Sequence, residues 1–151
     1  MDNGWLPKFM REAARRNYRV DFICLHWYND ITHPDAVDHL RQFLTNQWKL
    51  YGKPIWLTEF SGTTGDWVKP ANPPVDVAKN AEFARRALPM LESLQFVERY
   101  AWFELKWTGR PWEHVALVDP KTGGLTLTGT AYRDGDVAAL EQGPQSGSKN
   151  R

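Results

Sequence analysis

Short apolar segments alternate along this chain with longer amphipathic segments, and this alternation limits the folds open to it. The apolar segments are residues 20–28, 54–60 and 97–105. Their nearly continuous apolar character is typical of strands covered on both faces of a parallel sheet. Apolar side chains at the helical period of 3.6 residues occupy residues 5–16, 32–51 and 75–94. The order helix, strand, helix, strand, helix, strand predicts βαβ units and therefore an α/β fold.

Two kinds of parallel sheet fit this order, a doubly wound sheet and a (β/α) TIM barrel. A barrel enzyme carries its chemistry at the C-terminal ends of the strands. All three predicted strands end in polar or aromatic groups, at 26–28, Glu59 and 102–106. No Gly-rich phosphate loop follows any of them, which argues against nucleotide binding. We therefore expect part of a (β/α) barrel.

The charge balance excludes several classes of partner. Lys and Arg total 19 against 18 Asp and Glu, so the net charge of +1 predicts no binding to nucleic acid or to an anionic membrane. No run of 18 apolar residues exists. The start of the chain, residues 1–4, lacks the pattern of a signal peptide. We expect a soluble domain of 151 residues with a sizeable core.

Neither a metal nor another cofactor is expected. The four histidines, at positions 26, 33, 39 and 114, show no paired spacing of the kind that metal sites use. The single cysteine, Cys24, lies inside an apolar run and is expected to be buried as a small hydrophobic side chain.

Tryptophan is unusually frequent, with 8 residues in a chain that is 13% aromatic. Trp5 and Trp48 lie at helical spacing among apolar neighbours, so we expect them in the core. A flat indole also suits the apolar face of a sugar ring. Trp67, Trp107 and Trp112 follow predicted strands, where cleft walls and packing are equally good interpretations.

Glu59 is the sharpest candidate for chemistry, because it ends an otherwise apolar strand and precedes a Gly-rich loop. The alternative for Glu59 is an ordinary surface glutamate. His26 ends the preceding strand, and a lone histidine there is more often a structural donor than a ligand. Barrel geometry would nevertheless bring His26 within reach of Glu59.

Three blocks of sequence carry a family resemblance, at residues 20–28, 51–60 and 99–103. In this order they resemble the Asl1-like glycosyl hydrolase catalytic domain, glycoside hydrolase family 128. The resemblance extends from residue 5 to about residue 132. It implies an endo-β-1,3-glucanase with a (β/α)8 barrel and a retaining mechanism, acting on β-glucan of the cell wall. By this resemblance the protein is secreted.

The resemblance also implies roles for individual residues. The three strands correspond to the sixth, seventh and eighth of the barrel, and Glu59 matches the catalytic nucleophile on the seventh. Trp102 matches the aromatic residue that floors the subsite around the cleaved bond. His26 and Tyr28 resemble the sixth-strand residues that contact the sugar and orient the carboxylate, and 125–132 resembles the closing segment of the fold.

The second carboxyl group of a retaining enzyme has no obvious counterpart. In the family the acid/base is a glutamate preceded by asparagine at the end of the fourth strand, and this chain has no Asn-Glu dipeptide. Glu104 is the replacement that we nominate, with a hydrogen-bonding role at the rim as the alternative. Asp30 and Glu113 are further candidates that no spacing favours.

Residues 1–132 are thus predicted to form the C-terminal part of a barrel, and 133–151 a tail whose end is disordered. Such a fragment would leave both sheet edges and its inner face uncovered. It would therefore form a homo-oligomer or require the missing N-terminal half. Three functions remain open: a glucan hydrolase complete only as an assembly, a structural half-barrel, or a noncatalytic carbohydrate-binding fragment. The last would use Trp27, Tyr28 and Trp102 as a stacking surface.

Overall fold

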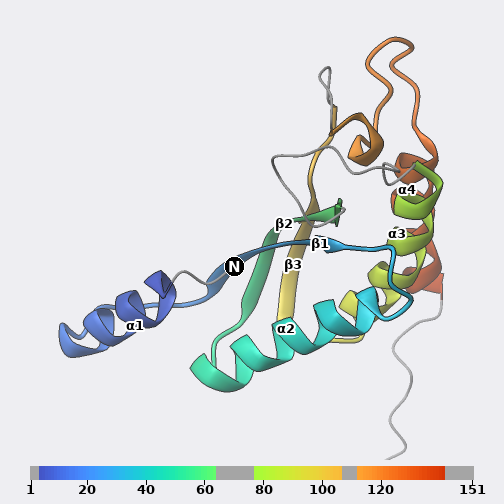
Figure 1. Ribbon diagram of the computed structural model, residues 1–151. Coiled ribbons are helices and arrows are strands. Elements are labelled where there is room, and N and C mark those ends of the chain that lie inside the picture. Colours follow the sequence, from blue (N-terminus) through green and yellow to red (C-terminus); the bar gives the residue numbers. More distant parts are fainter. Residues whose placement is uncertain (1–3, 64–76, 107–111, 142–151) are drawn as a thin grey trace, which may run out of the picture.

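The computed structural model describes residues 4–63, 77–106 and 112–141, with the backbone alone described at 112, 113 and 136–141. The described helices are α1 (Trp5–Arg15), α2 (Ala36–Tyr51), α3 (Val77–Glu92), the short 3-10 helix η1 (Trp112–Val115) and α4 (Leu127–Glu141). The strands are β1 (Ile23–Asp30), β2 (Ile55–Thr63) and β3 (Val97–Trp102). The predicted alternation of helices and strands is confirmed (Figure 1).

The three strands form one parallel sheet in the order β1-β2-β3. Their limits differ from the predicted ones. β1 begins three residues later than expected, at Ile23, and β3 ends at Trp102 rather than at 105. β2 does not end near Glu59 but continues through the first residues of the expected loop, as far as Thr63. The parallel α/β sheet is therefore established, and its closure into a barrel remains our proposal.

Helices α2, α3 and α4 supply the other side of the core (Figure 1). The sheet side chains that pack there are Ile23, Leu25, Trp27, Ile55, Leu57, Phe60 and Trp102. The opposite face of the sheet is open within the described residues, because Cys24 on that face is exposed. The expectation that Cys24 is buried is therefore wrong. Its side chain alternates with those of Ile23 and Leu25, which take the helix-covered face.

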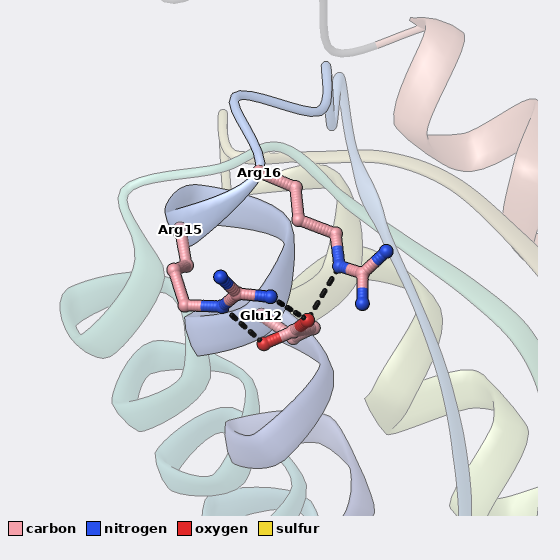
Figure 2. Close-up of polar contacts among 3 residues, drawn as sticks. All are labelled: Glu12, Arg15 and Arg16. Carbon is pink, nitrogen blue, oxygen red and sulfur yellow. Dashed lines mark hydrogen bonds and ion pairs between the residues drawn. The ribbon is translucent and has the colours of Figure 1, made fainter.

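α1 stands apart from the other helices (Figure 1) and reaches the core through Leu6 and Met10. Glu12, on its exposed side, accepts hydrogen bonds from Arg15 and Arg16 (Figure 2). Trp5 stacks on Phe9 but is 62% exposed, so its predicted place in the core is wrong.

Trp48 of α2 is likewise 40% exposed, although its ring stacks on that of Phe96 with a centroid separation of 4.7 Å. Its predicted burial is also wrong. Helical period alone cannot distinguish the centre of an apolar stripe from its edge. Within the described residues, no helix combines the length and the apolar character needed to cross a bilayer.

The C-terminal part of the described chain contains a tight turn and a helix. Asp119 accepts backbone hydrogen bonds from Lys121 and Thr122, which hold a tight turn. The segment 125–132, which resembles the closing segment of the fold, leads into α4. Because α4 extends to Glu141, the expected domain boundary at 132 falls inside this helix. The expected disordered tail, 142–151, lies outside the described residues.

Candidate active site

An irregularity in β2 places Glu59 on the open face of the sheet. Leu25 pairs with Leu57, but His26 pairs with Glu59, so Thr58 is an extra residue in β2. The Thr58 hydroxyl donates a hydrogen bond to the carbonyl of Leu25, 3.3 Å away, within the irregular stretch. Regular alternation from the buried Leu57 would have turned Glu59 toward the helices. The extra residue instead turns it to the same face as His26.

Two side chains of β1 meet the Glu59 carboxylate on a single oxygen. The Tyr28 hydroxyl donates a hydrogen bond to Oε2 of Glu59, and Nδ1 of His26 lies 3.3 Å from the same oxygen. The other carboxylate oxygen, Oε1, takes part in neither contact. The Glu59 side chain is 34% exposed, so the group is sheltered but accessible. The predicted association of His26, Tyr28 and Glu59 is present in the structure.

Tyr28 is held in its neutral, hydrogen-donating form. Burial raises the pKa of Tyr28, and the hydrogen bond to Glu59 and the negative charges of Glu59 and Glu104 raise this pKa further. The raised pKa favours the neutral phenol, which is the form that donates the hydrogen bond to Glu59. A neutral donor can orient a carboxylate without neutralising its charge.

Phe103 and Glu104, which follow β3, also lie beside Tyr28. The Phe103 ring meets that of Tyr28 edge to face, with the centroids 5.8 Å apart. The half-buried Glu104 lies close enough to Tyr28 for its charge to affect the hydroxyl. Phe103 belongs to the block 99–103 but was not assigned a role from sequence. The sequence feature that could have identified Phe103 is the two-residue period of β3, because this period puts Trp102 and Phe103 on opposite faces.

Trp27 and Trp102, which were expected to stack on sugar, do not join this site in the structure. Trp27 is 6% exposed and stacks on Phe83 of α3. Trp102 is 7% exposed, packs against Phe60, and donates a hydrogen bond from Nε1 to the Val115 carbonyl at 2.7 Å. The side chains of each strand alternate between the two faces of the sheet, and those of Trp27 and Trp102 take the helix-covered face.

The end of β2 beyond Glu59 is fixed by α3. The backbone N–H of Gly62 donates to Oδ1 of Asn80, a fully buried residue, at 3.1 Å. A Cβ at Gly62 would lie 2.2 Å from a carbon of Ile31 and 2.7 Å from the Asn80 oxygen. A larger residue at position 62 would therefore force the side chains of Ile31 and Asn80 to move. Sequence gave no signal for the role of Asn80.

The remaining candidates are separate from Glu59 or outside the described residues. Asp30, at the end of β1, accepts hydrogen bonds from both the backbone and the hydroxyl of Thr32. The side chains of Trp112 and Glu113 are among those not described, and Trp67 and Trp107 lie outside the described residues. In the part of the chain that is described, no three His, Cys, Asp or Glu side chains gather as metal ligands.

Comparison with known proteins identifies the family of this chain. Residues 1–132 match the family model described as glycosyl hydrolase catalytic core. Over 99 residues the chain is 38% identical to alkali-sensitive linkage protein 1 of Schizosaccharomyces pombe. The aligned segment covers 66% of this chain and 16% of that protein.

Solved structures show the same relationship. A family 128 subgroup I endo-β-1,3-glucanase from Amycolatopsis mediterranei, in complex with laminaritriose, is 40% identical with a TM-score of 0.76, over 89% of this chain and 53% of that one. A subgroup II endo-β-1,3-glucanase from Sorangium cellulosum is 30% identical with a TM-score of 0.61, over 85% of this chain and 46% of that one. The chain thus spans about half the length of these solved relatives. It belongs to the glycosyl hydrolase catalytic core family, and its resemblance to the Asl1-like domains of glycoside hydrolase family 128 is confirmed.

Proposed function

We propose that this chain carries the nucleophile of a glycoside hydrolase that acts on β-1,3-glucan, and that Glu59 is this nucleophile. The observation that carries the proposal is the attachment of Tyr28 and His26 to one oxygen of Glu59, Oε2. A carboxylate held in this way is oriented, and its second oxygen is left for attack. The solved relatives that are named endo-β-1,3-glucanases support the choice of substrate.

The proposed reaction is retaining. Oε1 of Glu59 attacks the anomeric carbon of a glucosyl unit, and the bond from that carbon to the glycosidic oxygen breaks. A second carboxyl group gives its proton to the departing oxygen. Water then attacks the glycosyl ester, loses a proton to the same second carboxylate, and restores Glu59.

We assign the second carboxyl group to a half of the barrel outside this chain, because the chain has no Asn-Glu dipeptide. The active form is then an assembly of two barrel halves. Glu104, which lies near Tyr28, would accept a hydrogen bond from a glucan hydroxyl beside Glu59. Phe103 would contact the sugar ring, the role that Trp102 cannot fill from the core. On family resemblance we place the protein outside the cell, at the wall.

A trapping experiment tests the nucleophile without requiring the second carboxyl group. A laminaribiosyl donor with a 2-fluoro substituent and a dinitrophenyl leaving group needs no protonation of the departing oxygen. Incubation of the chain should attach one 2-fluoro-laminaribiosyl group, located on Glu59 by peptide mass spectrometry. Glu59→Gln should remain unlabelled, and Glu104→Gln should still be labelled.

A noncatalytic carbohydrate-binding role is the second candidate, and the missing Asn-Glu dipeptide favours it. Binding of laminarihexaose by calorimetry, without labelling of Glu59, would support this role and refute the nucleophile. Cellohexaose is the matched ligand, with the same ring in β-1,4 linkage. Equal binding of both sugars would refute the proposed selectivity for β-1,3-glucan.

A further inference from the structure

A cavity of about 240 Å³ lies between helix α3 and the connection from β1 to α2, which runs beside that helix (Figure 1). We call it the loop pocket. The connection contributes residues 31–34, and α3 contributes side chains between Lys79 and Arg86. The Arg86 guanidinium donates a hydrogen bond to the Pro34 carbonyl, at 2.6 Å, and so joins the two sides. The pocket is large enough for a single sugar ring.

The loop pocket is separate from the Glu59 carboxylate. Its floor is made by two buried side chains, Ile31 and Phe83. The Phe83 ring stacks on that of Trp27, on the helix-covered side of the sheet. Because Glu59 lies on the open face, a ligand in the loop pocket would lie on the other side of the sheet from the carboxylate.

The charged side chains of the loop pocket balance one another. Lys79 and Arg86 bring positive charge to its wall, and Glu82 brings negative charge. The Asp30 carboxylate adds a second negative charge nearby, close enough to His33 and Lys79 for their charges to act on it. An anion would be repelled by the two carboxylates and a cation by the two basic groups. The balance therefore favours a neutral ligand.

The lining of the loop pocket also suits a sugar. A hydroxyl group both donates and accepts hydrogen bonds, and the wall offers Lys79 as a donor and Glu82 as an acceptor. Phe83 and Pro34 offer apolar surface to the C–H groups of a ring. Apolar surface with a few polar groups that converge on it is the usual composition of a small-molecule site.

We propose that the loop pocket binds one glucosyl unit of a neutral glucan, at a site apart from Glu59. The choice of glucan rests on the proposed function, whereas binding in the pocket requires neither Glu59 nor the second carboxyl group. A polymer held here would be kept close to the carboxylate, because a second contact on the same chain raises its effective concentration. A small anion is the competing occupant.

Methyl β-D-glucopyranoside is the probe, added to the isotope-labelled full chain and followed by NMR. Amides of residues 31–36 and 79–86 should shift and saturate in the millimolar range. Methyl β-D-glucuronide, with the same ring and a carboxylate, and inorganic phosphate should bind there no more tightly than the glucoside. Tighter binding of either anion would overturn the proposal in favour of an anion site.

The absence of saturable shifts at the pocket would also overturn the proposal. Shifts confined to residues 26–28 and 103 would have the same meaning for the pocket but would leave the nucleophile in place. Conversely, saturation at the pocket in a chain that fails to be labelled at Glu59 would refute only the nucleophile.

Substitutions on α3 test the wall of the pocket. Lys79→Ala and Glu82→Ala should each weaken binding of the glucoside by about fivefold or more, because each removes a hydrogen bond to a charged group. Arg85→Ala is the matched control, since Arg85 is exposed on the same helix but does not line the pocket. It should change the affinity by less than about twofold. Equal effects of the three substitutions would contradict binding in the loop pocket.

Discussion

The hydroxyl of Tyr28 donates its hydrogen bond to Oε2 of Glu59 across two adjacent parallel strands. Tyr28 pairs with Ser61 in the strand register, two residues beyond Glu59, so the phenol reaches back along the sheet to the carboxylate. His26, opposite Glu59 in the register, contacts the same oxygen. Because Tyr28 and His26 both contact Oε2, the carboxylate of Glu59 is held in one orientation.

Tyr28→Phe removes the donor but keeps the ring and its contact with Phe103. In the assembled enzyme we expect kcat for laminarin hydrolysis to fall on the order of 10²-fold, because small errors in nucleophile position are costly. KM should change little, since the phenol holds the carboxylate rather than the sugar. An unchanged kcat would show that the Tyr28 hydrogen bond does not position the nucleophile.

Phe103 and Trp102 are adjacent but should behave differently on substitution. Phe103→Ala should weaken laminarihexaose binding by about tenfold, through lost apolar contact with the sugar, and leave the fold intact. Trp102→Ala should lower the free energy of unfolding by about 3–5 kcal/mol, because it empties a core position. Calorimetric titration and urea unfolding of both variants measure the two effects. A Trp102→Ala protein that is as stable as the native chain but does not bind laminarihexaose would show that the indole contacts the sugar.

Trp102→Phe removes the indole hydrogen bond to Val115 together with part of the ring system. The carbonyl of the fully buried Val115 would lose this donor, at a cost of about 1–3 kcal/mol in the free energy of unfolding. Urea denaturation followed by circular dichroism gives the value. A cost below about 0.5 kcal/mol would indicate that another donor replaces the indole.

Gly62→Ala should be destabilising even though alanine is the smallest change available. The added methyl group would overlap Ile31 and the Asn80 oxygen, and overpacking of this kind costs about 1–3 kcal/mol. Gly124→Ala is the matched control, because its new Cβ would meet only the Thr122 hydroxyl, at 3.5 Å. Thermal unfolding should show a lower midpoint for Gly62→Ala than for the native chain. The midpoint of Gly124→Ala should be almost unchanged.

Asp30 should make stability depend on pH. Burial favours its protonated form, but hydrogen bonds from the side chain and backbone of Thr32 outweigh burial and lower the pKa of Asp30 below its ordinary value of 3.8. The stabilisation is therefore present above that value and is lost as the pH falls through the lowered native pKa. Relative to Asp30→Asn, the ionised Asp30 should add at most about 1 kcal/mol to the free energy of unfolding at neutral pH, because solvent screens its carboxylate.

Urea unfolding of the native chain and of Asp30→Asn, at pH values of about 7, 5 and 2, measures this dependence. The difference in unfolding free energy should be the same at the first two values and smaller at the third. A difference that instead grows on acidification would mean that the native pKa of Asp30 is raised.

The parallel sheet and the grouping of His26, Tyr28 and Glu59 could be predicted, because strands of one parallel sheet bring their C-terminal ends to the same edge. The choice between Trp102 and Phe103 could not. It depends on which of the two residues at the end of β3 and just beyond it takes the helix-covered face, and both are aromatic. The burial of Trp27 was missed in a similar way, since an apolar run without polar alternation does not show which side chains face the helices.

The limits of β2 were missed for another reason. Ser61 and Thr63 are fully or almost fully buried in the structure, yet their polar and small side chains are typical of a loop. Tertiary contacts, including the hydrogen bond from Gly62 to Asn80, extend the strand where local propensity would end it. Asn80 is 18 positions away in sequence, so no local pattern could connect the two.

The extra residue at Thr58 has a genetic consequence. Loss of the Thr58 codon would place Glu59 directly after Leu57, and regular alternation would then keep the carboxylate on the open face, opposite His26. Such a deletion should therefore leave the acid at the site, whereas one further inserted codon between Leu57 and Glu59 would offset the pairing again. In homologous genes the acid should accordingly stay beside the histidine whether or not the extra codon is present.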